Sequence, residues 1–363
     1  MPDDRAAPNI MVIGLSAYGA HGGIQRFNRR VIDTLAQMPV RLCVLMLADP
    51  AEAVAARSGV ARALGAGGSR GRFVRAFLPM AWRADLVVVG HVNLLPFALL
   101  YRLLRPRGRV ILFAHGVEVW GDPAYRRPNR WEPWAIRLAV DRIAIVSAYS
   151  RSLMARAFGV PMARFSLFPN AVDVTEASAR DMAGATVLAV SRLAETEREK
   201  HVDALIRALP RVLEAIPDAR LVVIGDGALR AELEALARAL GVAGHVDFAG
   251  FVTEEQLADA YAGAALFALP SSKEGFGIVY LEAWLRGLPV IASRYGAGGE
   301  VVADGVDGFA VDPADVDAIA RAMIDLLRDR EKARRFAAAG REKVERLYSA
   351  QAFRRNLEAL VCG

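Results

Sequence analysis

The stretch LPSSKEGFGIVYLE, residues 269–282, is the most informative part of this chain for both fold and binding. It continues from the apolar run 264–269, which predicts a buried strand, and its Gly-Phe-Gly turn leads into a second apolar run, which predicts a helix. Unpaired backbone N–H groups and the helix dipole at such a turn favour an anion such as a phosphate. The carboxylates of Glu274 and Glu282 can accept hydrogen bonds from hydroxyl groups. The segment therefore suits a ligand that is both anionic and polyhydroxylated, as a nucleotide sugar is.

Strands and helices are predicted to alternate along the whole chain. The expected strands are 10–15, 41–47, 86–90, 110–114, 142–146 and 165–168, then 186–190, 220–224, 246–248, 264–269 and 289–292. The expected helices are 24–37, 148–158, 201–216, 229–239, 254–262 and 278–286, with a mostly helical tail. Such alternation implies parallel sheets covered by helices on both faces. Two runs in succession predict an α/β fold of two Rossmann-like, doubly wound domains facing a central cleft, with ligands outside the carboxyl ends of the strands.

The domain boundaries follow from the same pattern. The segment of about 173–184 lacks apolar periodicity and is expected to link the domains. We expect a first domain over residues 1–172 and a second over 184–344, with a tail of about 345–363 that packs back on the first. A chain of 363 residues, 54% of them hydrophobic, is long enough for two such domains.

The cysteine content and the amino terminus favour a cytoplasmic protein. Cys43 and Cys362 are far apart and form neither a disulfide framework nor a metal cluster, which fits a reducing compartment. The start, MPDDRAAPNI, has acidic residues where a signal peptide has basic ones, and no apolar run reaches transmembrane length.

The positive charge is concentrated in the first half of the chain, where residues 1–180 hold 24 arginines, no lysine and 12 acidic residues. Arginine with interfacial tryptophan suits an anionic membrane surface, so a peripheral contact with the inner face of the cytoplasmic membrane is one interpretation. A merely arginine-rich solvated surface is the other. Nucleic acid is disfavoured, because no recognition motif accompanies the charge. The basic runs are Arg70, Arg72 and Arg75, then Arg102, Arg105, Arg107 and Arg109, then Arg126, Arg127 and Arg130, with Phe73, Phe77, Trp82, Trp131 and Trp134 among them.

A set of motifs in a fixed order resembles the retaining glycosyltransferases of family 4, the group 1 transferases, which have the GT-B fold. The motifs are AVSRL at 189–193, VVIGDG at 222–227, VDFAGFV at 246–252, LPSSKEGFGIVYLEAW at 269–284, GLPVIAS at 287–293 and GVDGFAVDP at 305–313. GGIQRFNRRV at 22–31 and AHG at 114–116 complete the pattern in the first half. The resemblance covers nearly the whole chain and is strongest over residues 186–313.

The resemblance implies a donor site in the second domain. Arg192 and Lys200 would hold the donor diphosphate and neutralise the charge that builds on the leaving nucleoside diphosphate. Glu282 would accept hydrogen bonds from the ribose, and Glu274 would contact the transferred sugar. The sequence departs from the family after the lysine, where His201 replaces a glycine. The remaining donor-binding positions are Phe251 and Val252, through their backbone at the base, and Phe276, Gly277 and Ile278, through their N–H groups.

The acceptor and the reacting sugar are expected against the first domain. Gly22 and Gly23 precede a helix and, having no side chains, let a phosphate or an acceptor approach the backbone closely. We assign Gly23 to the donor and Gly22 to the acceptor. The resemblance places His115 beside the reacting sugar, where it steadies the oxocarbenium-like transition state. Glu118 and Trp120 are expected to position the acceptor.

The expected reaction is transfer of a hexose, of mannose or glucose type, with retention of configuration. The donor would be a GDP- or UDP-hexose and the acceptor a glycan or polyprenyl-linked glycan in bacterial surface polysaccharide synthesis. No DxD-like triad is positioned to chelate a diphosphate, so no metal and no cofactor are expected and positive side chains take the metal's place. Double displacement by two carboxylates is disfavoured, because Glu274 and Glu282 are assigned to binding. A same-face mechanism, in which the leaving phosphate deprotonates the acceptor, needs no protein nucleophile.

Three other functions stay open at this point. One is a different GT-B chemistry, such as epimerisation of a nucleotide sugar, and a second is an inactive homologue that binds the nucleotide sugar as a scaffold. A Rossmann oxidoreductase is the weakest. The first predicted strand is followed by GLSAYGAHGG instead of GxGxxG, and Asp49 is only the nearest acidic residue to the end of the second strand.

Overall fold

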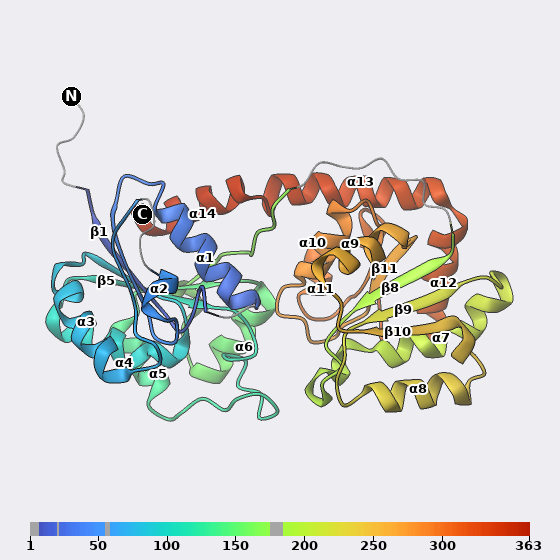
Figure 1. Ribbon diagram of the computed structural model, residues 1–363, viewed down its shortest axis with the longest axis horizontal. Helices are drawn as coiled ribbons and strands as arrows, with labels where there is room; N and C mark the ends of the chain where they lie inside the picture. Colours follow the sequence, from blue (N-terminus) through green and yellow to red (C-terminus); the bar gives the residue numbers. More distant parts are fainter. Residues whose placement is uncertain (1–6, 20–21, 55–58, 175–183) are drawn as a thin grey trace. The chain divides into compact units, whose positions relative to one another are not determined.

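The computed structural model describes residues 7–19, 22–54, 59–174 and 184–363, and it contains two compact units, each built on one parallel sheet (Figure 1). The first unit comprises Met1–Pro169 and the last residues, Arg354–Gly363. The second comprises Asn170–Phe353. Most of the predicted linker at 173–184 lies outside the described residues. The two parallel α/β units confirm the predicted fold class.

The first sheet has seven parallel strands in the order β3-β2-β1-β4-β5-β6-β7. Its strands alternate with helices, and α3, α4 and α5 lie side by side (Figure 1). The strands are β1 (Asn9–Gly14), β2 (Arg41–Met46), β3 (Val60–Gly65), β4 (Leu86–Val89), β5 (Arg109–Ala114), β6 (Arg142–Ile145) and β7 (Phe165–Leu167). The α-helices are α1 (Gly23–Leu35), α2 (Ala51–Val54), α3 (Arg70–Arg83), α4 (Leu95–Leu104), α5 (Glu132–Ala139), α6 (Ala148–Phe158) and α14 (Ala350–Cys362), with short 3-10 turns η1 (Val92–Leu94) and η2 (Met162–Arg164).

The second sheet has six parallel strands in the order β10-β9-β8-β11-β12-β13. Helices α7, α8 and α12 pack together on one face, and α10 packs against α13 on the other (Figure 1). The strands are β8 (Thr186–Val190), β9 (Arg220–Ile224), β10 (Val246–Gly250), β11 (Leu266–Leu269), β12 (Val290–Ser293) and β13 (Gly308–Val311). The helices are α7 (Val202–Ala215), α8 (Arg230–Ala239), α9 (Glu254–Gly263), α10 (Ile278–Leu285), α11 (Gly298–Val301), α12 (Val316–Arg328) and α13 (Arg330–Leu347), with 3-10 turns η3 (Glu195–Lys200) and η4 (Ala243–His245).

Each sheet reverses its strand order at its centre, which is where ligands bind in this architecture. In the first sheet β1 lies between β2 and β4, so the loops after β1 and β4 diverge there. In the second sheet β8 lies between β9 and β11. The loop after β8 carries Arg192 and the loop after β11 carries Glu274, and both leave the same edge because all the strands are parallel.

The sequence did not predict β3, β13 or helices α3 to α5. Strand β3 is an exposed edge strand, so it lacks a clear apolar pattern, and β13 has only four residues. Helix α3 contains Pro79, and helix α4 is apolar nearly all round. In both helices the polar-apolar period that marks a helix is therefore weak.

Two aromatic residues of the predicted membrane surface are buried, and several of its arginines are paired. Phe73 and Phe77 are both 0% exposed in the core under α3, so they cannot sit at a membrane interface. Arg126 forms an ion pair with Glu132. Arg102 lies 2.6 Å from the carboxylate of Asp141. Part of the arginine content therefore holds the unit together. Among the described residues, no helix is both long and apolar enough to cross a bilayer.

Candidate active site

The centre of the second unit's site is an ion pair between two residues that the sequence assigned to the donor. Lys200 Nζ lies 2.6 Å from Glu274 Oε2, and the two side chains are 18% and 16% exposed. The residues come from η3, which follows β8, and from the loop after β11, so neighbouring strands bring together positions 74 apart in the sequence. The structure thus places a cation and a carboxylate in contact, partly shielded from water, at the carboxyl edge of the second sheet.

A third charged residue, Glu197, links this pair to Arg192. Glu197 is 9% exposed, its Oε1 accepts a hydrogen bond from Arg192, and its Oε2 lies 3.7 Å from Lys200 Nζ. The side chain of Arg192 is 79% exposed, so its guanidinium is available to a ligand. Glu197 was not predicted as a site residue. Its only signal in the sequence was the acidic character of residues 194–199.

The residue after Lys200 is His201, which has the backbone conformation that glycine adopts most easily and is held there by a side-chain contact. Its φ is 54°, in the left-handed region that glycine adopts most easily. Its Nε2 lies 2.8 Å from Ser272 Oγ, and the backbone N–H of Ser272 donates to Glu199 O at 2.9 Å. These contacts tie η3 to the loop that carries Glu274, and the side-chain bond offsets the backbone strain.

Two glycines of the VVIGDG motif allow the loop after β9 to pack on the loop that carries Arg192. A Cβ at Gly225 would lie 2.0 Å from Ser191 O, and one at Gly227 would lie 2.4 Å from the backbone of Leu193. Both glycines have positive φ, 122° and 154°. Close packing therefore explains the two glycines of the motif, because no larger residue fits between the two loops.

The predicted backbone donors lie at the start of α10. Gly277 precedes the helix with a φ of 91°, so α10 begins at Ile278 with its first N–H groups unpaired by a capping side chain. Phe276 is 5% exposed and packs edge-on against Tyr348 at 5.5 Å, which holds the turn. This arrangement presents N–H groups and the positive end of a helix beside Glu274.

The residues expected to bind the nucleoside differ in how much of each is exposed to solvent. Phe251 is 82% exposed, so its ring is a surface group, and Val252 is half-buried. Glu282 is half-buried on α10, near Tyr261. Burial and the neighbouring carboxylate of Glu282 both raise the pKa of Tyr261.

In the first unit, His115 follows β5 and is held by three neighbours. Its backbone N–H donates to Glu118 Oε1 at 2.6 Å, its Nε2 lies 3.2 Å from Gly90 O, and its ring meets Phe27 edge-on at 4.7 Å. Burial lowers the pKa of His115, which favours the neutral ring. A proton on Nε2 satisfies the contact with the carbonyl of Gly90 and leaves Nδ1 as an acceptor.

The two residues expected to position the acceptor are both buried and hydrogen-bonded within the first unit. Trp120 is 5% exposed and donates from its indole nitrogen to Ser150 Oγ at 3.0 Å, and its role toward an acceptor stays a prediction. Glu118 is 8% exposed, and its carboxylate orients the His115 backbone.

Gly22, just before α1, and Gly23, its first residue, are both exposed. A Cβ at Gly23 would meet no atom of the described chain within 4 Å, so nothing in this unit requires a glycine there. Gly22 has an extended backbone with φ 164°. The open space leaves room for a ligand to approach the start of the helix.

The sequence missed two buried residues at the carboxyl edge of the first sheet. Asp49 is 0% exposed, and its carboxylate accepts from Ser16 Oγ and from the N–H groups of Ala17, Tyr18 and Gly19 at 2.8, 2.8 and 2.9 Å. Burial alone would raise the pKa of Asp49, but these four hydrogen bonds outweigh it and hold the pKa below 3.8. Asp49 therefore shapes the loop after β1. His91, which follows β4, is 9% exposed, and burial lowers its pKa.

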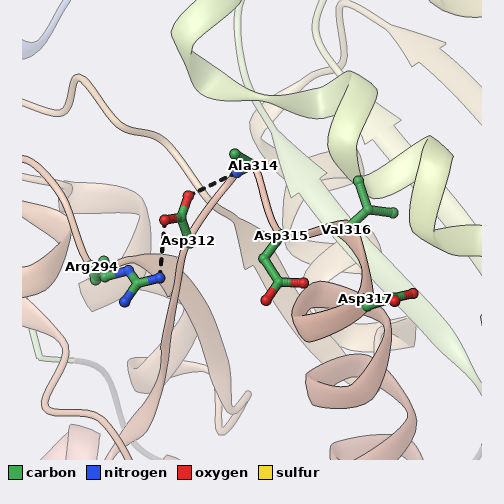
Figure 2. A pocket seen from close by; sticks show the side chains of 6 residues that line it. All are labelled: Arg294, Asp312, Ala314, Asp315, Val316 and Asp317. Atoms are coloured by element: carbon green, nitrogen blue, oxygen red, sulfur yellow. Dashed lines mark hydrogen bonds and ion pairs between the residues drawn. The ribbon is translucent and has the colours of Figure 1, made fainter.

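A shallow hollow elsewhere in the second unit has the wrong charge for a diphosphate. Figure 2 shows Asp312 between Arg294 and the backbone of Ala314, with Asp315 and Asp317 nearby. Asp312 accepts from Arg294 at 3.0 Å and from the Ala314 N–H at 2.9 Å, which neutralises the one cation that lines the hollow. Asp315 and Asp317 also line the hollow, so its lining has more carboxylates than cations.

Comparisons with known proteins agree with this geometry. Residues 175–343 match the family model described as glycosyl transferases group 1, and residues 21–176 match the model described as Glycosyltransferase Family 4. Two parallel Rossmann-like units with these motifs at their strand ends are the architecture of a GT-B glycosyltransferase. The chain belongs to glycosyltransferase family 4 and is a transferase.

Two relatives are similar over most of their length. The chain is 39% identical over 280 residues, 71% of each protein, to the GDP-mannose-dependent alpha-(1-6)-phosphatidylinositol monomannoside mannosyltransferase of Mycolicibacterium smegmatis. It is 33% identical over 276 residues, 70% of each protein, to a GDP-mannose-dependent monoacylated alpha-(1-6)-phosphatidylinositol monomannoside mannosyltransferase of Corynebacterium glutamicum.

Solved structures share the fold at lower identity. Sucrose-phosphate synthase from Thermosynechococcus elongatus has a TM-score of 0.77 at 22% identity, covering 98% of both chains. HepE of Anabaena in complex with UDP has a TM-score of 0.75 at 20% identity, covering 98% of this chain and 99% of that one. These likenesses support the two-unit architecture.

Proposed function

We propose that this protein transfers a hexose from a nucleoside diphosphate sugar to a lipid-linked or glycan acceptor, with retention of anomeric configuration. The contact between Lys200 and Glu274 carries this proposal, because it joins a phosphate-binding cation to a hydroxyl-binding carboxylate at one strand edge. In the absence of donor the two groups neutralise each other. A donor diphosphate would compete for Lys200 and release Glu274 to accept hydrogen bonds from the sugar.

The positive groups around this pair would stabilise the leaving group. Arg192 is exposed enough to reach a diphosphate, and the start of α10 adds backbone N–H groups. Charge builds on the leaving nucleoside diphosphate as the glycosidic bond breaks, so cations fixed near it lower the barrier. We expect these groups to do this without a divalent metal or a cofactor.

The proposed mechanism needs no protein nucleophile. The acceptor hydroxyl would attack from the face that the diphosphate leaves, and a phosphate oxygen would take its proton. His115 contributes as a neutral ring held by Gly90 O, and we propose that it steadies the positive charge that develops on the sugar ring. Glu274 fixes the orientation of the sugar through its hydroxyls.

GDP-mannose is the donor that we propose to test first, with a phosphatidylinositol monomannoside as the acceptor. The two mannosyltransferases named above, at 39% and 33% identity, are described as GDP-mannose-dependent and as acting on phosphatidylinositol monomannoside, which supports this order of testing. A UDP-hexose and a polyprenyl-linked glycan are the second pair. With a lipid-linked acceptor, the enzyme would work at the inner face of the cytoplasmic membrane.

A transfer assay with radiolabelled donor tests the proposal. The purified chain is incubated with GDP-mannose or UDP-glucose and each lipid acceptor, with and without a chelator, and the product's anomeric configuration is read by NMR. We expect transfer that the chelator does not reduce and that Glu274→Gln lowers by about 100-fold or more. The matched control is Glu234→Gln, which removes a half-buried ion pair of 2.8 Å with Arg230 on α8 and should keep full activity.

The same assay separates the other functions. Conversion of the donor sugar into an epimer without any acceptor would favour an epimerase. Nucleotide binding with no turnover of any donor would favour an inactive homologue. Full activity of Glu274→Gln would contradict the assignment of the site.

A further inference from the structure

Glu197 is a buried carboxylate to which the proposed mechanism gives no role. Its side chain is 9% exposed, whereas Glu195, two residues earlier in the same turn η3, is exposed. A carboxylate is costly to bury unless cations pair with it. Glu197 has two such cations, because it accepts a hydrogen bond from Arg192 and its Oε2 lies 3.7 Å from Lys200 Nζ. These are the same two cations that we assign to the donor diphosphate.

The turn that carries Glu197 is fixed to the elements on both sides of it. Arg198 donates to both carboxylate oxygens of Glu232 on α8, each at 2.8 Å. On the other side, the backbone N–H of Ser272, in the loop after β11, donates to Glu199 O at 2.9 Å. The two residues that follow Glu197 are thus tied to two different elements. Its backbone is therefore held beside the cations.

Glu197 differs from Glu274 in what a donor can offer it. The hydroxyl groups of a bound sugar would replace Lys200 as the partners of Glu274. Glu197 is buried and already has two partners, so a ligand reaches its carboxylate only by displacing them. The negative charge of Glu197 therefore stays beside Arg192 and Lys200 while a diphosphate is bound.

This charge opposes the binding of an anion. The formal charges of the four groups sum to zero, because Arg192 and Lys200 are positive and Glu197 and Glu274 are negative. A diphosphate must therefore draw the cations away from carboxylates that already pair with them. It also meets the repulsion of a like charge that it does not displace. A neutral residue in place of Glu197 would remove both costs.

We propose that Glu197 is an internal counter-ion that limits how tightly the nucleoside diphosphate is held, and so favours release of this product after transfer. Affinity differences among variants of one site arise mainly in the dissociation rate, so weaker binding means faster release. Release of product limits turnover in many enzymes. Glu197 acts through Arg192 and Lys200 and is a positioning residue. This inference rests on the proposed function, because it takes these two cations as the diphosphate site.

Calorimetric titration of the full chain with GDP and with UDP tests this role without measuring sugar transfer. Glu197→Gln keeps the shape of the side chain and removes its charge. Whichever nucleotide binds the parent more tightly should bind this variant about 3- to 10-fold more tightly. Glu197→Asp keeps the charge and should bind that nucleotide within about twofold of the parent. A merely structural role would instead weaken binding in both variants.

A second measurement and a matched control accompany the titration. Release of radiolabelled nucleotide into excess unlabelled nucleotide, timed by rapid filtration, should slow in Glu197→Gln by a factor similar to the gain in affinity. Glu195→Gln removes the same charge from an exposed position of the same turn, where solvent screens it, and should change the affinity by less than about twofold. Glu197→Ala removes the charge with a smaller side chain and should also bind more tightly. Thermal unfolding without nucleotide checks the fold of each variant.

Three results would overturn the inference. They are a Glu197→Gln affinity no higher than that of the parent, weaker binding in both the Gln and the Asp variants, and an equal gain in Glu195→Gln. The second would show that Glu197 only supports the turn, and the third that the effect is diffuse charge. If neither nucleotide binds the parent, the proposed function fails and this inference fails with it. If a nucleotide binds the parent and only the Glu197 variants depart from expectation, the inference fails alone.

Discussion

Replacing Asp49 by asparagine should destabilise the first unit and disturb the loop after β1. Both carboxylate oxygens are used: Oδ2 accepts from the N–H groups of Ala17 and Tyr18, each at 2.8 Å, and Oδ1 accepts from Gly19 at 2.9 Å and from the Ser16 hydroxyl. An amide of the same size has one carbonyl oxygen. In its less costly orientation the amide oxygen keeps Ala17 and Tyr18, and the NH₂ group faces Gly19 and the Ser16 hydroxyl. The hydroxyl can turn and accept, so the Gly19 N–H is the donor that loses its partner.

The cost follows from the one orphaned donor. A buried donor left without an acceptor costs roughly 1–3 kcal/mol. Taking about 2 kcal/mol and roughly 2–4 °C per kcal/mol for a unit of this size, the Tm should fall by about 4–8 °C. Activity should also fall, because the same loop leads into Gly22 and Gly23.

Thermal unfolding as a function of pH measures this effect. The hydrogen bonds lower the pKa of Asp49 below 3.8, so its contribution is fully present above about pH 4 and is lost as the pH falls through the folded-state pKa. The gap between parent and variant should therefore be constant near neutral pH and narrow in acid. Glu52→Gln on α2, an exposed carboxylate, should leave the Tm unchanged. A Tm of Asp49→Asn within about 1 °C of the parent at pH 7 would refute the reasoning.

Three further predictions concern the second unit. Glu274→Gln should lower turnover by about 100-fold or more, since the sugar is no longer oriented, while calorimetry shows GDP binding that is no weaker, because Lys200 loses a competing anion. Arg192→Ala should weaken GDP binding about 10-fold in the same titration, and unchanged affinity would remove it from the diphosphate site. His201→Gly should be more stable in denaturant than His201→Ala by about 1 kcal/mol, because only the alanine variant keeps the left-handed strain after losing the bond to Ser272. The reverse order would show that the backbone at His201 is not strained.

The regular elements could be predicted where the sequence pattern was local and strong. Strand β8, over Thr186–Val190, and helix α6, over Ala148–Phe158, have the bounds that the sequence predicted. A run of buried apolar residues between turn signals is enough to place such an element. Helix α3 failed this test, since Val74, Leu78 and Trp82 are exposed opposite a buried face and blur the period.

The sequence predicted which residues belong to the candidate site, but not which contacts they make with one another. The motifs placed Lys200 and Glu274 in one site, and the register of β8 with β11 brings them together. That the two side chains pair directly, and that Glu197 joins them to Arg192, depends on how two loops fold over the strand ends. Sequence spacing contains no information on that geometry.

The sequence by itself determined the alternation of strands and helices, the class of fold and the loops that carry the motifs, because apolar periodicity and turn residues act over a few neighbouring positions. Only the tertiary structure decided which partner each charged or aromatic side chain takes. It buried Trp120 and Phe73 and gave Asp49 four donors from a loop 30 to 33 residues away. It also gathered Arg41, Arg62 and Arg83 around one cavity at the amino-terminal edge of the first sheet. Those outcomes depend on the parallel register of strands far apart in the chain, which fixes the distances between groups that the sequence keeps separate.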